Sequence, residues 1–306
     1  MMKHVIAFAT TLVLLSQAPA HAQAVRTFVA ANGNDAAVCS GAAPCRTFAG
    51  AIAKTAAGGV ISCVNAADYG AVTIAKSISI VCDNTQAGIT TTAVGITVAT
   101  AASDTVTLSG LDLEGGGAGT SGIAFTQGGT LHVHNVRIRG FRGGGGFAFG
   151  ISVTPTAAVK LDISESVISE SGSGYNGAAL TISTTGPVVG VSIWKTRMEN
   201  NRIGLRVFGS PTALNVTAAD STFTGNGTAV MTGGAAIMLQ NAVISNNQIG
   251  ISNGNPGGQV RIGNSVVTGN GTGISTVFGA FTTSYKNNQI RGNGSDGTPL
   301  AAETAE

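Results

Sequence analysis

The side chains best suited to chemistry in this 306-residue sequence are concentrated between Arg137 and Arg206. Eight of the sixteen lysines and arginines fall there: Arg137, Arg139, Arg142, Lys160, Lys195, Arg197, Arg202 and Arg206. The only tryptophan, Trp194, lies among them, and His132 and His134 come just before. Guanidinium groups bind carboxylates through paired hydrogen bonds, and an aromatic ring offers a flat face for stacking. This composition favours binding of an acidic sugar polymer.

The elements that position these residues follow a repeat. Apolar residues after a polar corner recur every 21 to 30 residues, at Leu113, Ile138, Ile168, Met198, Phe223, Ile244, Val267 and Ile290. Similar phrases accompany them, such as DSTFTGNGTAVM from Asp220 and NSVVTGNGTGIS from Asn264. One short strand–turn unit cannot bury its apolar face alone, so units of this kind must stack.

Stacking the repeats on their apolar residues brings distant polar residues level with one another. His132 becomes level with Asp162, and His134 becomes level with Trp194 two repeats later. We therefore expect one outer face over three repeats to carry a ligand-binding set, consisting of His132, His134, Arg137, Arg139, Asp162, Trp194 and Arg197. An ordinary solvated face is the competing interpretation, because Glu165, Glu170 and Glu199 offset part of the charge.

The start of the chain predicts secretion. Lys3 provides a charged start, Val5–Leu15 is an apolar run, and Ala20-His21-Ala22 is a small-residue cleavage site, which together predict a signal peptide at 1–22. The apolar run is shorter than the roughly 20 residues needed to cross a bilayer, so we expect no membrane span. We expect the mature protein in the periplasm or outside the cell.

Composition narrows the class of protein further. Glycine numbers 45 and charged residues make up only 10%, which is typical of a β-rich, turn-rich chain rather than one with exposed helices. Loss of Lys3 with the leader would lower the formal charge from +2 to +1. This near-neutral balance argues against a nucleic-acid partner.

Four cysteines remain after the leader: Cys39, Cys45, Cys63 and Cys82. In an oxidising compartment they predict two disulfides, with three possible connectivities. We favour the local pairs, Cys39 with Cys45 and Cys63 with Cys82. The second pair lies 19 residues apart in strand-like runs, and stacked strands about 4.8 Å apart suit a bridge. A metal site is disfavoured, because the spacings are not of the CxxC kind and no histidine lies nearby.

The coil length indicates the architecture. Coils of 21 to 25 residues with three short strands are the unit of a parallel β-helix. Thr47–Ala57 is expected to form a short amphipathic helix, ended by Gly58-Gly59, that caps the first coil. A turn column is expected to hydrogen-bond along the stack, formed by Asn201, Asn226, Asn247, Asn270 and Asn293. Leucine-rich repeats would need a helix after each strand, and a β-propeller needs repeats of about 40 residues.

With these features the sequence resembles the right-handed parallel β-helix proteins, the superfamily that includes pectate lyases. The resemblance rests on the opening VAANGNDAAVCSGAAPCRTFAGAIAKTAAGG, on DYGAVTI, and on the NSVVTGNGTGIS-type coils. It covers nearly the whole chain after the leader, and the opening looks like the N-terminal cap of secreted bacterial members. It implies an all-β, right-handed parallel β-helix solenoid at 23–295, with a capping segment and its helix at 23–58 and a C-terminal tail at 296–306.

Enzymes of this superfamily act on acidic polysaccharides, but their signatures are missing from this sequence. The Asn-Thr-Asp, Asp-Asp and Gly-His-Gly that polygalacturonases share do not occur, nor does the Asp-Pro-His-Asp of the epimerases. Glycoside hydrolysis needs two facing carboxylates, and calcium-dependent lyases need clustered ones. The nearest acidic pair, Asp112 and Glu114, stands beside Gly115–Gly117 in what reads as a solvated corner.

These observations favour a secreted, non-catalytic protein that binds carbohydrate or another extracellular macromolecule through its lateral face. The expected partner is an acidic polysaccharide or cell-surface glycan, and no metal or cofactor is expected. One alternative is a divergent polysaccharide lyase or glycoside hydrolase, in which Arg137, Arg197 or His132 would be the base. Another is a structural or adhesive surface protein without a sugar ligand.

Overall fold

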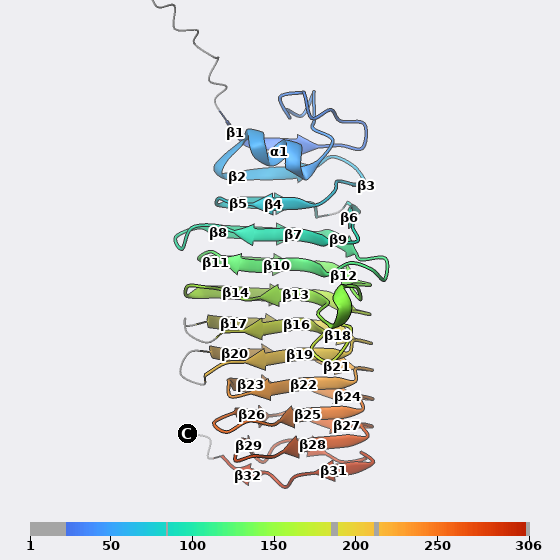
Figure 1. Cartoon of the computed structure of the whole chain (residues 1–306), viewed down its shortest axis with the longest axis vertical. Coiled ribbons are helices and arrows are strands. Elements are labelled where there is room, and N and C mark those ends of the chain that lie inside the picture. Colours follow the sequence, from blue (N-terminus) through green and yellow to red (C-terminus); the bar gives the residue numbers. More distant parts are fainter. Residues whose placement is uncertain (1–22, 84, 185–188, 211–213, 304–306) are drawn as a thin grey trace, which may run out of the picture.

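A computed structural model describes residues 23–83, 85–184, 189–210 and 214–303. The predicted signal peptide at 1–22 lies outside the described residues. The chain winds as a solenoid whose coils pass in turn through three parallel sheets, stacked along the long axis (Figure 1).

The largest sheet, sheet A, has twelve strands, each parallel to its neighbours. In spatial order they are β1 (Ala24–Val29), β2 (Thr55–Cys63), β5 (Ile78–Val81), β8 (Thr105–Ser109), β11 (Thr130–His134), β14 (Val159–Ser164), β17 (Val189–Trp194), β20 (Leu214–Ala219), β23 (Ala236–Gln240), β26 (Gln259–Gly263), β29 (Phe281–Ser284) and β32 (Ala301–Ala302).

Sheet B receives the chain next and has ten short strands. They are β3 (Ala67–Asp68), β6 (Ala87–Thr90), β9 (Leu111–Glu114), β12 (Arg137–Arg139), β15 (Val167–Ser169), β18 (Arg197–Glu199), β21 (Thr222–Thr224), β24 (Val243–Ser245), β27 (Val266–Thr268) and β30 (Gln289–Ile290).

Sheet C closes each coil, also with ten strands. They are β4 (Val72–Ile74), β7 (Val94–Ala99), β10 (Ser121–Gln127), β13 (Phe149–Val153), β16 (Ala178–Ser183), β19 (Ile203–Phe208), β22 (Thr228–Gly233), β25 (Ile249–Asn253), β28 (Thr272–Thr276) and β31 (Ser295–Gly297). The expected all-β, right-handed parallel β-helix is confirmed, and this handedness is the one that parallel crossovers adopt almost without exception.

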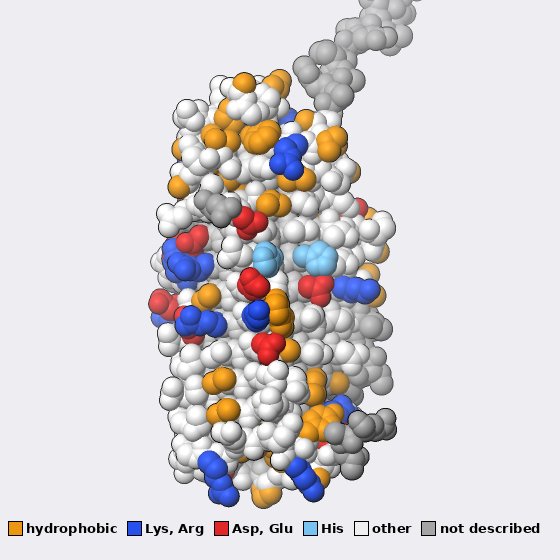
Figure 2. Space-filling model, turned by 180° about the vertical axis from the view of Figure 1, so that it is seen from behind, with side chains coloured by type: hydrophobic (Ala, Val, Ile, Leu, Met, Phe, Trp, Pro, Cys, Tyr) orange, Lys and Arg blue, Asp and Glu red, His pale blue; other side chains and the backbone are white. Residues whose placement is uncertain are grey.

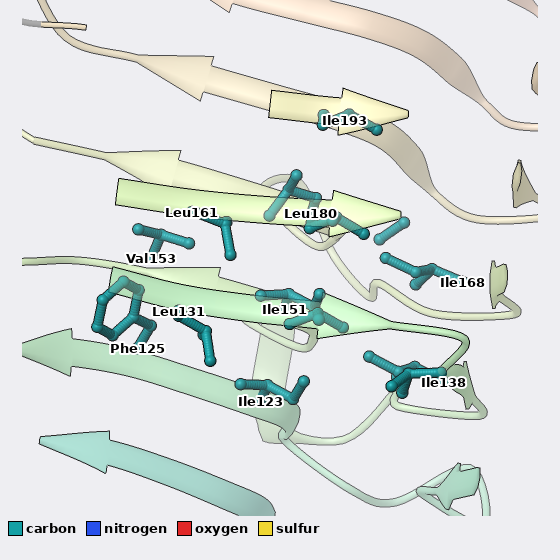
Figure 3. Packing of buried hydrophobic residues seen from close by; sticks show 14 of the residues in the cluster. Ile123, Phe125, Leu131, Ile138, Ile151, Val153, Leu161, Ile168, Leu180 and Ile193 are labelled. Atoms are coloured by element: carbon teal, nitrogen blue, oxygen red, sulfur yellow. The ribbon is translucent and has the colours of Figure 1, made fainter. Parts of the chain in front are cut away.

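The core forms because alternate strand residues point inward and successive coils are in register. In sheet B the register places Ile138 against Leu113 and Ile168, as the repeat predicted. In sheet C the glycine–isoleucine steps align, so that Ile123 lies beside Ile151. Figure 3 shows the four isoleucines among these side chains inside the coil, and they are fully or nearly fully buried. Each inward column therefore continues through many coils.

The capping helix exists but is shorter than the sequence suggested. Helix α1 spans Phe48–Lys54, with Thr47 as its N-cap residue accepting a hydrogen bond from the Gly50 backbone N–H. It ends at Lys54 because Thr55 already belongs to β2, so Gly58-Gly59 lies inside a strand and does not end the helix. Phe48 packs against Tyr69 and covers the first coil.

Both favoured disulfides are present. Cys39 pairs with Cys45, with 4.6 Å between their Cα atoms, and Cys63 pairs with Cys82, with 5.0 Å. The first closes a loop of the capping segment. The second ties the end of β2 to the residue after β5, which joins the cap to the first coil.

The predicted asparagine column is a continuous ladder, buried from Asn201 to Asn270 and partly exposed at Asn293. In Asn226, the side-chain oxygen accepts hydrogen bonds from the backbone and side chain of Asn201, and the side-chain amide donates to Asn247. The pattern repeats down to Asn293. The ladder amides also donate to backbone carbonyls of the apolar column, as Asn226 does to Met198. Each coil is thereby bonded to the next through side chains as well as strands.

The corner between sheets A and B is equally regular. In the six coils from β11–β12 to β26–β27 it has two residues, and the first adopts a positive φ in Asn135, Glu165, Lys195, Asp220, Asn241 and Asn264. At the far end, β31 and β32 pair with β28 and β29, so strands continue into the segment 296–306 that the sequence suggested as a tail. No helix among the described residues is long and apolar enough to cross a membrane.

Candidate functional site

The basic stretch does not form a single face. Each coil visits all three sheets, so residues a few positions apart point in different directions. Arg137, Arg139 and Arg197 lie on sheet B, whereas Arg206 lies on sheet C. The expectation that arginine, histidine and tryptophan share one outer face was wrong, because a common period shows which residues are level but not on which sheet they lie.

Sheet A does bring together the histidines, Asp162 and Trp194. His132 is paired with Asp162, with 3.0 Å between Nδ1 and Oδ2, and His134 Nδ1 lies 3.0 Å from the Ser164 hydroxyl. Trp194 is level with Ser164 on the following strand. Figure 2 shows the two histidine side chains side by side on this face, with acidic and basic side chains below them.

Trp194 is already engaged by its neighbours. Its ring N–H donates to Asp220 across 3.0 Å, and the Lys195 ammonium lies 4.0 Å from the ring centroid. Hydrogen bonds from the Asn241 amide and then from Trp194 hold the pKa of Asp220 below its ordinary value. Trp194 as a residue is 39% exposed, but one face of its ring is occupied by a cation. Only the other face of the Trp194 ring is left for stacking against a sugar ring.

The sheet B arginines are largely neutralised by carboxylates. Arg139 contacts both Asp112 and Glu114, and the hydrogen bond with Asp112 raises the pKa of the guanidinium. Arg197 pairs with Glu199. Exposed pairs of this kind contribute little stability, and they leave little net charge for an anionic ligand.

Arg137 has no ion pair within the described part of the chain. It lines a surface hollow of about 230 Å³ whose wall also contains Asp112 and Glu165. Two carboxylates in the wall oppose the entry of an anion. Sheet B therefore resembles a solvated face more than a binding site for acidic sugars.

Two insertions mark a different surface. The corner between sheets B and C is expanded at 140–148 and at 170–177, which is why the repeat lengthens to 30 residues there. The two loops lie against each other through an antiparallel bridge between Ala148 and Ser173 and a hydrogen bond from the Ser173 hydroxyl to the Gly143 carbonyl. In repeat proteins, insertions of this kind often carry binding residues.

These loops present aromatic rings to solvent. Tyr175 is 79% exposed and Phe147 is 60% exposed, whereas the phenylalanines of the interior column are fully buried. An aromatic ring held in water on a protruding loop has no packing role there. It provides an apolar surface onto which the C–H face of a sugar ring can pack.

Arg206 lies beside these loops on the outer face of sheet C. Its terminal nitrogens donate to Thr181 and Asn176, at 3.2 and 3.0 Å, and its guanidinium stacks 4.0 Å from the Phe208 ring centroid. Burial lowers its pKa, and within the described residues it has neither an ion pair nor a partner for its buried Nε. A cation that has lost water without gaining an anion is a site where an anionic ligand is favoured.

We call this surface the loop site: Phe147, Tyr175, Asn176, Thr181, Arg206 and Phe208. Arg206 belongs to the basic stretch of the sequence, but no role was predicted for it there. The available signals were the two 30-residue spacings and the glycine run at Gly143–Gly146. Both signals mark an insertion into the repeat. Residues in such an insertion are the ones expected to bind a ligand instead of building the repeating core.

The acidic side chains of the described residues are not arranged as a cluster that could hold a metal ion. The described residues contain no group of three or more histidine, cysteine, aspartate or glutamate side chains that could hold a metal. The hydrogen bonds and ion pairs of Asp112, Glu114 and Glu199 are all with arginine or the backbone.

Three parallel sheets, an interior of stacked columns and a side-chain ladder define a parallel β-helix protein. No protein-family model and no curated protein matches the sequence. Among solved structures, pectate lyase Pel9A is similar, with 17% identity and a TM-score of 0.70 over 92% of this chain and 78% of that one. The A-module of the Azotobacter vinelandii mannuronan C-5 epimerase AlgE4 gives 13% identity and a TM-score of 0.44, over 92% and 89%. The predicted likeness to pectate lyases is confirmed as a likeness of fold.

Proposed function

We propose that this chain is a secreted protein that binds an acidic polysaccharide at the loop site, without cleaving it. The observation that carries the proposal is the half-buried Arg206, stacked on Phe208 and lacking an acidic partner within the described residues. A uronate carboxylate would supply the missing anion. Tyr175 and Phe147 would pack against neighbouring sugar rings.

Three further observations support this proposal. The predicted leader and the two disulfides fit an oxidising, extracytoplasmic compartment. The fold similarity to a pectate lyase supports a polysaccharide ligand. The opposed carboxylates around Arg137 and Arg139 make sheet B a weaker candidate for the same ligand.

The test is binding of polygalacturonate and alginate, with a neutral glucan as the control polymer. We expect R206A and Y175A each to weaken binding of the acidic polymers at least tenfold. R291A is the matched control, since it removes one charge from an arginine that is 92% exposed at the far end of the solenoid. Y175A keeps the test valid if R206A folds poorly, because Tyr175 is exposed and contributes nothing to the core.

W194A decides between the loop site and the sheet A face. If W194A weakens binding while R206A and Y175A do not, the ligand lies on the surface predicted from sequence and the loop site is rejected. If no variant changes binding, or if no acidic polymer binds, the proposed function fails and an adhesive or structural role takes its place.

A polysaccharide lyase is the second candidate, favoured by the fold shared with pectate lyase Pel9A. It is tested by incubating the wild-type chain with the same polymers and following the ultraviolet absorbance of unsaturated product ends, with reducing sugar as the readout for hydrolysis. Turnover that a single substitution abolishes would overturn the non-catalytic proposal. Binding without turnover would support it.

A further inference from the structure

The two described histidines lie together on the outer face of sheet A. They are the only histidines of the described chain, and both point to the outer face of β11, two residues apart. Strand geometry puts side chains at this spacing about 7 Å apart at their bases, on the same face of the sheet. Imidazole rings at that separation can lean together over one ion.

Each histidine already has a hydrogen-bond partner for one ring nitrogen. His132 Nδ1 is held by the Asp162 carboxylate and His134 Nδ1 by the Ser164 hydroxyl, both at 3.0 Å and both from β14. An imidazole whose Nδ1–H donates to an oxygen presents the lone pair of Nε2 outward. Metal-binding histidines almost always have one ring nitrogen bonded in this way, which fixes the tautomer and the ring orientation.

Carboxylates stand on both sides of the pair, and one lysine, Lys160, shares the outer face of β14 with Asp162. Asp162 lies one coil below, and Ser109, which is level with His134 one coil above, donates to the Asp83 carboxylate across 2.7 Å. With two protein ligands, the remaining coordination positions belong to water or to an arriving ligand, as in open metal sites. Imidazole ligands select ions such as Cu²⁺, Ni²⁺ and Zn²⁺ over Ca²⁺ and Mg²⁺.

We propose that His132 and His134 form a two-histidine site for an exchangeable divalent transition-metal ion, oriented by Asp162 and Ser164. The site is independent of the loop site, which lies on sheet C, so either can fail without the other. Since Cu²⁺ binds such ligands most tightly among these ions, it is the probe of choice.

The experiment titrates Cu²⁺ alone into the full chain carrying H4Q and H21Q, so that His132 and His134 are its only imidazoles. Trp194 is the single tryptophan and lies two strands from His134, about 10 Å away, which is close enough for copper to quench its fluorescence. We expect saturable quenching that Zn²⁺ competes with and Ca²⁺ does not.

The variants make the proposal falsifiable. H132A and H134A should each abolish saturable binding, and D162N should weaken it by about 10- to 100-fold, the usual effect of losing an outer-shell partner. R137A, which alters charge on sheet B, should change nothing. Saturable quenching that survives either histidine substitution, or an unchanged affinity in D162N, would overturn the site. All these side chains are exposed, and circular dichroism confirms that each variant is folded.

Discussion

The coils from β12 to β17 and those from β18 to β28 pass through the same three sheets but differ at one corner. In the second group the corner between sheets B and C has three residues with a buried asparagine at the centre, as in Gly225-Asn226-Gly227. In the first group it expands to 140–148 and 170–177. The same core therefore supports a closed corner and an elaborated one.

The difference arises where the ladder ends. Ser171 occupies the ladder position above Asn201, and its backbone N–H donates to the Asn201 side chain. Its own hydroxyl donates to the carbonyl of Ser169, and the described residues show no bond from this hydroxyl to the coil above. Without an asparagine link at this position the corner can accept extra residues, and the two expanded corners contact each other through Ser173 and Gly143 instead. In this molecule the regular coils hold the structure, while the irregular ones carry the candidate ligand site.

The largest effect is expected from breaking the ladder. N247A removes the acceptor for the Asn226 backbone N–H and the donor for the Phe223 carbonyl, both inside the corner. Buried groups without partners cost roughly 1–3 kcal/mol each, so unfolding free energy should fall by about 3 kcal/mol in urea titrations. N215A, on the exposed face of sheet A, should change it by less than about 0.5 kcal/mol. Equal effects of the two would show that the ladder contributes nothing.

A smaller effect should separate the two kinds of corner by their glycines. Gly225 and Gly145 both have positive φ, at 68° and 58°, so alanine costs about 1–2 kcal/mol at either position. An added Cβ on Gly225 would also overlap the Asn200 side chain, whereas nothing lies near Gly145. G225A should therefore lose about 1 kcal/mol more than G145A in the same titration. If G145A is the more damaging, the expanded corner is the tighter one and the comparison reverses.

Shortening the expanded corner should affect binding more than stability. Deleting Gly145 and Gly146 removes no buried residue, so the unfolding free energy should change by less than about 1 kcal/mol. The deletion displaces Phe147, and the affinity for polygalacturonate should fall severalfold. A stability loss as large as that of N247A would mean that the insertion is structural.

The smallest effect concerns the junction between the two groups, where Trp194 of β17 bonds to Asp220 at the corner after β20. The pKa of Asp220 is lowered, first by the Asn241 amide and then by Trp194. The charged hydrogen bond should persist as pH falls through the ordinary aspartate value, about 3.9, and be lost only below it. Trp194 emission should follow this change, and D220N should remove the pH dependence. A transition at the ordinary aspartate value would show that these contacts do not lower the pKa of Asp220.

Much of the fold could be predicted from the sequence, because a stacked repeat fixes register directly. The interior column through Ile138 and Ile168, the ladder through Asn226 and the pairing of Cys63 with Cys82 all depend on period alone, and all are confirmed. Helix α1 was overestimated because alanine-rich sequence favours helix until pairing with β1 overrides it.

The candidate site was harder to predict. Level residues were identified correctly, as His132 and Asp162 show, but the faces were not. The corner residues that turn the chain from sheet A to sheet B, such as Glu165 and Lys195, are not glycine or asparagine and give no clear turn signal. The contacts of Arg206 with Asn176 and Phe208 join different loops and strands, and no local pattern encodes them.

The two-residue corner between sheets A and B has a consequence for how such a chain can diversify. In six successive coils, from β11–β12 to β26–β27, this corner keeps two residues, whereas four residues, 285–288, join β29 to β30. The corners between sheets B and C and between sheets C and A vary in length from coil to coil. We therefore expect relatives of this chain to differ in length at those two corners and at the ends of the solenoid, while the edge between sheets A and B stays even along the middle coils.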